Sequence, residues 1–156
     1  MRVNILHSRR RIPRTRFGRA MATMFTLAAI TAATLVTTAS PAAATASGCT
    51  AARDIGLVCG EVIGSGLHIS TATVTRTRPG WPVSGNVCDY QGLITVYNSS
   101  GSQIYQQRSP KHSGCTFYIG WFDFNVNRYF PNNSKISLSF YEYGVHQGTV
   151  SFKITT

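Results

Sequence analysis

Residues 135–143 read KISLSFYEY and carry the clearest repeat in the chain, an apolar residue at every second position. Successive side chains of a β-strand point to opposite faces, so this order separates apolar side chains from polar ones and tyrosines. The apolar set is Ile136, Leu138 and Phe140. The stretch therefore predicts a strand that is buried on one face, with Tyr141 and Tyr143 on the other face.

The same alternation recurs between turn-forming residues. Residues 149–154 repeat it and are predicted to form a hairpin with 135–143 through a connection at 144–148. Five more strands are predicted at 57–63, 67–77, 88–97, 103–108 and 115–124. The last has aromatic residues on both faces and is expected to be central. This pattern predicts an all-β domain, a single antiparallel two-sheet sandwich of about seven strands, immunoglobulin-like or related, with a small barrel as the alternative.

The first 46 residues are predicted to be a secretory signal peptide. Seven of the fifteen Lys and Arg residues lie in the first nineteen positions, an uncharged stretch follows at 20–36, and Ala44-Thr45-Ala46 fits a cleavage site. The Arg-rich start leaves both the general secretory and the twin-arginine route open. Residues 47–156 then form one secreted, extracellular domain, with 47–54 expected to be a flexible arm.

The exported part is much less basic than the whole chain. It carries eight Lys and Arg against five Asp and Glu, a net charge of about +3 compared with +10 overall. This charge gives little electrostatic reason for a nucleic-acid partner, and we expect none. No stretch after the leader is long and apolar enough to span a membrane, so no membrane contact is expected once the signal is removed.

The four cysteines of the chain all follow the predicted cleavage site. An even number of cysteines in an exported domain indicates two disulfides, with three possible pairings. We favour Cys49 with Cys59 and Cys88 with Cys115, because each pair is then neighbouring in sequence and the second pair joins the starts of two predicted strands. Zinc is the competing interpretation, but the closest pair is too far apart for a usual zinc knuckle.

Residues that could support catalysis are sparse. The exported part has three histidines and five carboxylates, and it contains no zinc-hydrolase, nucleophile-elbow or phosphate-loop motif. We therefore predict a protein without enzymatic activity, cofactor or metal. His112 is expected to be a solvent-facing loop residue, and Asp123 a hydrogen-bonded structural residue.

A binding role has more candidates. Fifteen aromatic residues lie in the exported part, and five tyrosines fall on the polar or ambiguous side of predicted strands: Tyr97, Tyr105, Tyr118, Tyr141 and Tyr143. A face of this kind can stack on sugars or form a protein interface, although ordinary cross-strand packing also explains it. Two loops are further candidates. One holds Trp81, which could bind a partner or cover the end of the core, and the other is the basic loop 108–114 with Arg108, Lys111 and His112.

Three short segments point to a family. Residues 59–67 read CGEVIGSGL, and two cysteines lie in Asn86-Val87-Cys88 and Ser113-Gly114-Cys115. In these segments and in its size the exported part resembles small secreted actinobacterial β-sandwich proteins, and distantly the adaptor subunit of the umbrella toxin particles of Streptomyces. The resemblance implies a non-catalytic sandwich that bridges a lectin-bearing, protease-like subunit to a repeat-containing toxin stalk. It also implies that the arm at 47–54 inserts into a partner.

The leading hypothesis is therefore a secreted, non-enzymatic protein-interaction domain with a secreted protein as its partner. Its most specific version is an adaptor that binds larger subunits of an extracellular toxin complex. A carbohydrate-binding module that uses the tyrosine face is the alternative. A protease inhibitor that presents the loop before Cys115 is the third hypothesis.

Overall fold

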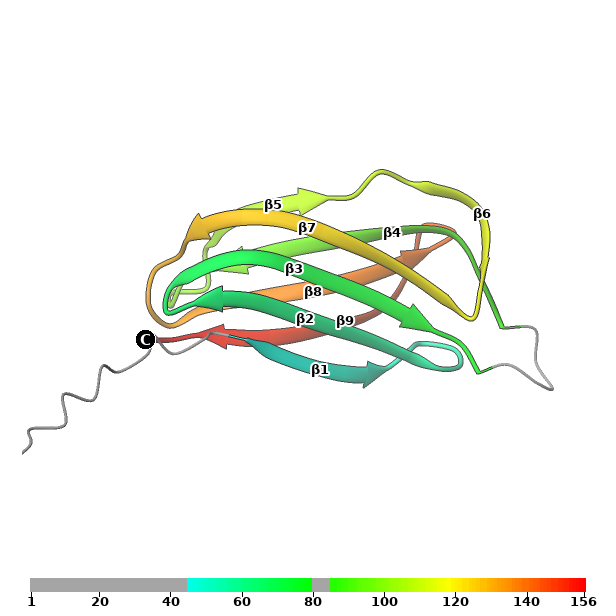
Figure 1. Cartoon of the computed structure of the whole chain (residues 1–156), viewed down its shortest axis with the longest axis horizontal. Coiled ribbons are helices and arrows are strands. Elements are labelled where there is room, and N and C mark those ends of the chain that lie inside the picture. Colours follow the sequence, from blue (N-terminus) through cyan, green and yellow to red (C-terminus); the bar gives the residue numbers. More distant parts are fainter. Residues whose placement is uncertain (1–44, 80–84) are drawn as a thin grey trace, which may run out of the picture. The chain divides into compact units, whose positions relative to one another are not determined.

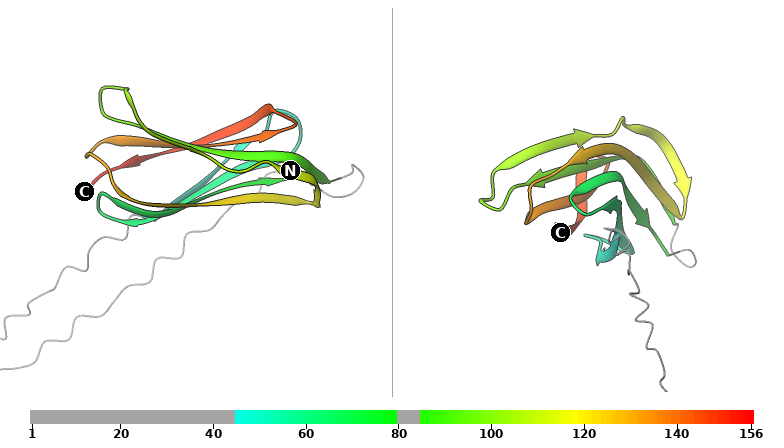
Figure 2. Two further views of the ribbon diagram at one scale, coloured as in Figure 1. Left: turned by 90° about the horizontal axis from the view of Figure 1, so that it is seen from above. Right: turned by 60° about the vertical axis from the view of Figure 1, so that its left-hand side comes forward.

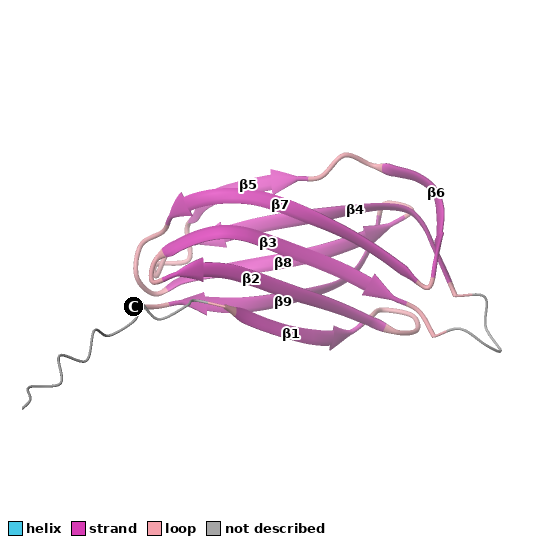
Figure 3. Cartoon of the chain, viewed as in Figure 1, coloured by secondary structure: helices cyan, strands magenta, loops and turns pink. Residues whose placement is uncertain are grey.

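The computed structural model describes residues 45–79 and 85–156, and every regular element in these ranges is a strand (Figure 3). The strands are β1 (Ala46–Ala51), β2 (Leu57–Ser65), β3 (His68–Thr77), β4 (Asn86–Tyr97), β5 (Gln103–Arg108), β6 (His112–Phe117), β7 (Ile119–Tyr129), β8 (Ser134–Glu142) and β9 (Val145–Ile154). In these ranges there is no helix long and apolar enough to cross a membrane. All but the last two residues of the predicted signal peptide, and Trp81, lie outside the described residues.

The described strands form two antiparallel sheets packed face to face. One sheet has the order β1-β2-β3-β7 and lies in front in Figure 1, and the other has the order β5-β4-β8-β9 with β6 also paired to β4. The view from above in Figure 2 shows the two layers. The predicted antiparallel sandwich is confirmed, with nine strands in the described part of the chain where seven were expected.

The alternation of β8 and β9 places their apolar side chains in the core between the sheets. Ile136, Leu138 and Phe140 of β8 are fully buried, and Val150 and Ile154 of β9 are nearly so. Burying each side chain of this size stabilises the fold by about 1.5–3 kcal/mol. The faces predicted for these two strands are confirmed.

The hairpin predicted for residues 135–154 is present as β8–β9, and β2–β3 and β4–β5 also form hairpins. The connection between β8 and β9 is shorter than predicted, because residues 145–148 belong to β9 and only Tyr143 and Gly144 form the turn. Both residues have positive φ, 52° and 77°. A two-residue turn with positive φ at both positions matches the twist of the strands that it joins.

The single central strand predicted at 115–124 is wrong. The chain leaves β6 at Phe117, takes a left-handed conformation at Tyr118 (φ 64°), and continues as β7 in the other sheet. β6 pairs with β4, whereas β7 pairs only with β3 and is an edge strand. The aromatic residues on both faces of 115–124 predict a central strand, but an edge strand can also carry exposed aromatic side chains.

The flexible arm predicted at 47–54 is also wrong for most of its length. Residues 46–51 form β1, which pairs with β2 along its whole length. Its small residues show no apolar alternation, so no strand is predicted there from the sequence. Gly48 nevertheless faces Phe152, whose ring lies 3.5 Å from the position that a Cβ atom would take. β1 is therefore a packed edge of the sandwich.

The predicted disulfide pairing is confirmed. Cys49 and Cys59 are directly opposite each other on β1 and β2, and Cys88 and Cys115 are opposite on β4 and β6. Each bond thus fastens an edge strand to its neighbour. In the loop-entropy model the two closures contribute about 3 and 3.5 kcal/mol, before any native strain.

Candidate functional site

The outer face of the four-stranded sheet carries several large exposed apolar side chains. Two neighbouring rows cross this face, Leu57, Thr77 and Ile119 in one and Cys59, Thr75 and Trp121 in the next. Leu57, Ile119 and Trp121 are 45%, 40% and 51% exposed. We call these three residues the Trp121 patch. Figure 1 looks onto the face that carries it.

The position of Trp121 follows from the inward residues of β7. Phe124 and Val126 are buried in the core, so the opposite parity of the strand, which includes Trp121 and Asp123, points outward. At the corner before β7, Phe117 and Tyr118 are also exposed, with their ring centroids 3.7 Å apart. Because Trp121 lies on an edge strand and points away from the core, its indole is accessible.

One side of the Trp121 patch is acidic. The row after Trp121 consists of Glu61, Thr73 and Asp123. Asp123 accepts a hydrogen bond of 2.7 Å from the hydroxyl of Thr73, as expected for a structural residue. Within the described strands of this sheet, the rows from Glu61 to Leu57 contain no Lys or Arg that points outward. The face therefore combines apolar surface with negative charge.

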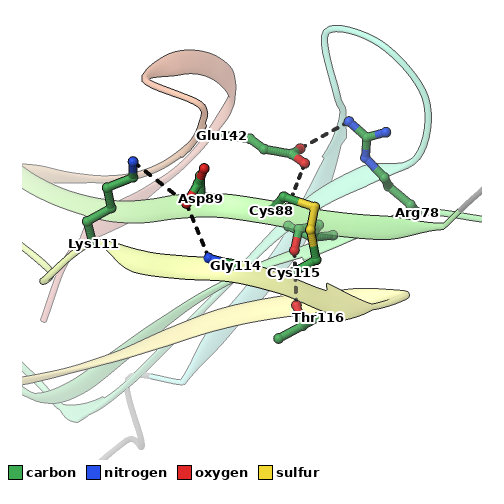
Figure 4. Close-up of a disulfide and its surroundings, with 9 residues drawn as sticks. Arg78, Cys88, Asp89, Lys111, Gly114, Cys115, Thr116 and Glu142 are labelled. Atoms are coloured by element: carbon green, nitrogen blue, oxygen red, sulfur yellow. Dashed lines mark hydrogen bonds and ion pairs between the residues drawn. A yellow bond between two sulfur atoms is a disulfide. The ribbon is translucent and has the colours of Figure 1, made fainter.

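A buried ionic cluster lies at the end of β3, and the sequence analysis missed it. The fully buried side chain of Arg76 forms an ion pair with Asp54, which also accepts a 2.6 Å bond from Arg78. Arg78 reaches Glu142 at 3.1 Å, and the other oxygen of Glu142 accepts the N–H of Cys88 at 2.9 Å (Figure 4). The signal was present, because Arg76 has the inward parity of Ala72 and Val74 on the predicted strand.

Burial dominates the electrostatics of this cluster. Desolvation lowers the pKa of the Arg76 guanidinium from its ordinary value, and Arg78 adds to this effect, while Asp54 and Glu142 oppose it. A guanidinium remains charged at neutral pH even so. Two cations against two carboxylates make the cluster neutral, which indicates a structural role in joining the 52–56 loop, β3, β4 and β8.

Of the residues predicted for binding that the structure describes, only Arg108 and Tyr141 come together. Both lie on the outer face of the five-stranded sheet, where the guanidinium of Arg108 is 5.0 Å from the centre of the Tyr141 ring. Tyr143 is 63% exposed but belongs to the β8–β9 turn, so it does not share this face. The expected pairing of Tyr141 and Tyr143 on one strand face is therefore wrong.

The basic loop before Cys115 is largely held against the sheet. Only residues 109–111 are loop, and Ser109 exchanges two hydrogen bonds with Gly92 of β4 at 3.0 and 2.8 Å. Lys111 is exposed and lies 3.7 Å from Asp89. His112 is half-buried in β6 and stacks on Tyr90 with ring centroids 4.4 Å apart, so the expected solvent-facing loop histidine is wrong.

The remaining tyrosines of the predicted face diverge. Tyr97 lies on the same outer face as Tyr141. Tyr105 turns toward the core and contacts Phe130 edge-on, with centroids 5.7 Å apart. Tyr118 occupies the corner between the sheets. Two of the five tyrosines therefore share a face.

Comparison with known proteins gives no relative. No protein-family model, curated protein or solved structure matches the chain. Within residues 45–79 and 85–156, no group of three or more His, Cys, Asp or Glu side chains could hold a metal ion. The lack of enzymatic activity and of a cofactor stays a prediction.

Proposed function

We propose that the domain is a secreted, non-enzymatic protein-interaction domain that binds a partner protein through the Trp121 patch. The observation that carries the proposal is a half-exposed tryptophan in the row next to the one that holds Leu57 and Ile119, on a sheet face whose opposite side is fixed by the core. Tryptophan is among the residues that most often dominate the energy of a protein interface. A face held by two sheets and a disulfide loses little freedom on binding.

The charge of the residues around the patch indicates which charge the partner carries. Glu61 and Asp123 border the Trp121 patch on one side, without an outward-pointing cation in the adjoining described rows. Complementary charges across an interface steer association and exclude wrong partners. The partner therefore presents an apolar recess for the indole, with Lys or Arg residues placed to meet these carboxylates.

The resemblance to small secreted actinobacterial sandwiches supports a more specific version, an adaptor in an extracellular toxin assembly. In that version the partner is one of the larger subunits of the complex. The N-terminal strand has a different place in this proposal from the one that the resemblance implies, because β1 is paired and tied by Cys49–Cys59. The adaptor would thus bind through a preformed face.

The geometry favours this role over protease inhibition. An inhibitory loop has to project from its scaffold so that it can enter a protease cleft. The loop at 109–111 is instead bound to Gly92 through Ser109. The inhibitor hypothesis therefore has no support from the position of this loop.

The test is recovery of a stoichiometric partner from culture supernatant, followed by calorimetric titration with the purified partner. Trp121→Ser is expected to weaken binding at least about tenfold, because truncating a central aromatic anchor costs about 2 kcal/mol or more. Tyr129→Ser is the matched control, since Tyr129 is an 80% exposed aromatic residue at the far end of the same strand.

Equal binding by the wild type and Trp121→Ser would contradict the proposal. Self-association is the other outcome to examine, by light scattering of the purified chain. A dimer that Trp121→Ser separates into monomers would replace the partner protein with a second copy of this chain. Thermal unfolding of each variant shows whether the loss of binding reflects the interface or the fold.

A further inference from the structure

The outer face of the five-stranded sheet holds an open groove of about 830 Å³ over β4, β8 and β9. Two rows of small side chains form its floor, Thr95, Ser137 and Ser151 in one and Leu93, Ser139 and Thr149 in the other. Five of these six side chains carry hydroxyl groups. We call this surface the hydroxyl groove.

The hydroxyl groups are paired but not saturated. Ser137 and Ser151 lie 2.9 Å apart, and Ser139 and Thr149 lie 2.7 Å apart, oxygen to oxygen. Thr149 also bonds to Nε2 of His146 at 2.8 Å, and Ser137 and Ser139 are only 8% and 9% exposed, so the exposed Thr149 and Ser151 are the most accessible members of the two pairs. A hydroxyl group can donate one hydrogen bond and accept two, so each pair retains capacity for a ligand. Rows of hydroxyl groups on a rigid sheet suit a ligand that itself presents many hydroxyl groups.

A tyrosine lies at each end of the hydroxyl groove. Tyr97 pairs in register with Lys135, and Tyr141 lies six residues further along the same strand, β8. At the usual rise of a strand these positions are about 20 Å apart. The Tyr97 ring offers apolar surface together with a polar tip, and Tyr141 offers its polar tip beside the Arg108 guanidinium, which lies over its ring, so the groove fits an extended chain of polar units.

The charge of this face indicates that the ligand is negatively charged. Three cations point outward from it, Arg108, Lys135 and Lys153. Of the five carboxylates in residues 47–156, Asp54 and Glu142 lie in the ionic cluster and Glu61 and Asp123 lie on the other sheet, while Asp89 lies at the start of β4, 3.7 Å from Lys111. None of them forms an ion pair with Arg108, Lys135 or Lys153 within the described residues, so these three cations give the face a positive charge.

The pairing of Lys135 with Lys153 is separate evidence for an anionic ligand. They are exposed and directly opposite each other on β8 and β9. Like charges in this position destabilise a sheet, and neither lysine forms an ion pair within the described residues. An anionic ligand that bridges the two would remove this repulsion.

We propose that the hydroxyl groove binds a linear acidic oligosaccharide. Carboxylates of its uronic acid units lie against Lys135 and Lys153, and its hydroxyl groups bond to the Ser and Thr rows between Tyr97 and Tyr141. The site is separate from the Trp121 patch, because the two surfaces are on different sheets and face away from the shared core.

The test is calorimetric titration of the full chain, expressed with its leader, with hexagalacturonate and with a hexamer of hyaluronan. Cellohexaose serves as the neutral probe of the same length. Binding of an acidic hexamer is expected to be stronger than binding of cellohexaose and to weaken as salt is added. The double variant Lys135→Gln/Lys153→Gln is expected to bind at least about tenfold more weakly.

Two controls separate the site from general charge and from folding. Lys111→Gln removes an exposed lysine outside the hydroxyl groove and is expected to bind as the wild type does. The double lysine variant is expected to melt no lower than the wild type, because it removes a repulsion. Trp121→Ser is expected to keep wild-type sugar affinity, so failure of one proposal is distinguishable from failure of the other.

The proposal is overturned if neither acidic hexamer binds, or if the double lysine variant binds as tightly as the wild type. It is also overturned if an oligothymidylate of equal charge binds as tightly as the acidic hexamers. That result would show recognition of negative charge alone. Weaker binding by Ser151→Ala, an exposed position on the floor of the groove, would support contact with sugar hydroxyl groups.

Discussion

Replacing Glu142 by Gln removes one of the two carboxylates that neutralise the buried Arg76 and the half-buried Arg78. The side chain of Glu142 is 2% exposed, and its two oxygens accept bonds from Arg78 at 3.1 Å and from the N–H of Cys88 at 2.9 Å (Figure 4). Gln has the same shape but one oxygen. If that oxygen keeps the Cys88 bond, the amide NH₂ group faces the Arg78 guanidinium, and two donors meet.

The cost follows from what remains unpaired. A hydrogen bond to a charged group contributes about 1.5–3 kcal/mol, and breaking a fully buried ion pair costs about 3–5 kcal/mol. The lower range applies here, because Asp54 is 42% exposed and still neutralises part of the charge, and water screens that side. We expect a loss of about 2–3 kcal/mol in the free energy of unfolding, or roughly 8–12 °C in Tm for a domain of this size.

Thermal unfolding at neutral pH, followed by circular dichroism with the disulfides intact, measures this effect. Glu61→Gln is the matched control, because Glu61 is exposed and forms no ion pair or side-chain hydrogen bond within the described residues. It should shift Tm very little. If both variants unfold within a few degrees of the wild type, the ionic cluster does not stabilise the sandwich and the reasoning is refuted.

Two further perturbations test the core and the covalent links. Phe140→Ala, at a fully buried position beside Tyr90, is expected to cost about 3–5 kcal/mol, whereas Tyr143→Ala in the exposed turn should leave the melting temperature almost unchanged. Replacing Cys88 and Cys115 by Ser is expected to lower the melting temperature by roughly 10–15 °C, and native thiol alkylation should detect no free cysteine in the wild type.

The sequence was sufficient to predict the strands that have one face in the core and the other in solvent. β8 shows why: Ile136, Leu138 and Phe140 face the core and are fully buried, whereas the opposite face carries the exposed Lys135 and the polar Ser137 and Ser139, which are 8% and 9% exposed. In such a strand the residues that face the core are apolar and those on the other face are polar, so the polarity of the sequence alternates. The two disulfides were also predictable, since each cysteine pair closes a short loop between neighbouring strands.

The strands that were mispredicted lie at edges. β1 is built from small residues, and its position depends on pairing with β2 and on the contact between Gly48 and Phe152, which no local pattern encodes. The division between β6 and β7 depends on a single left-handed residue, Tyr118. Tyrosine rarely adopts this conformation, so the sequence contained no turn signal there.

The Trp121 patch was within reach of sequence reasoning. Ile119, Trp121 and Asp123 share one parity, and Phe122, Phe124 and Val126 share the other. The second half of the strand shows which parity is inward, because Asp123 and Val126 differ so clearly in polarity. The hydroxyl groove was not within reach, because its rows join residues from three strands and appear only with the register.

The two proposed surfaces differ in chemistry because different types of residue occupy the outward positions of the two sheets. The four-stranded sheet exposes apolar side chains bordered by Glu61 and Asp123, and the five-stranded sheet exposes hydroxyl groups bordered by Lys135 and Lys153. The inward positions of both sheets form one core. A protein partner and an acidic sugar chain could therefore bind at the same time without competing for a residue. A domain that holds both at once would attach its protein partner to a surface coated with that sugar, which is what an adaptor without catalytic activity would need to do.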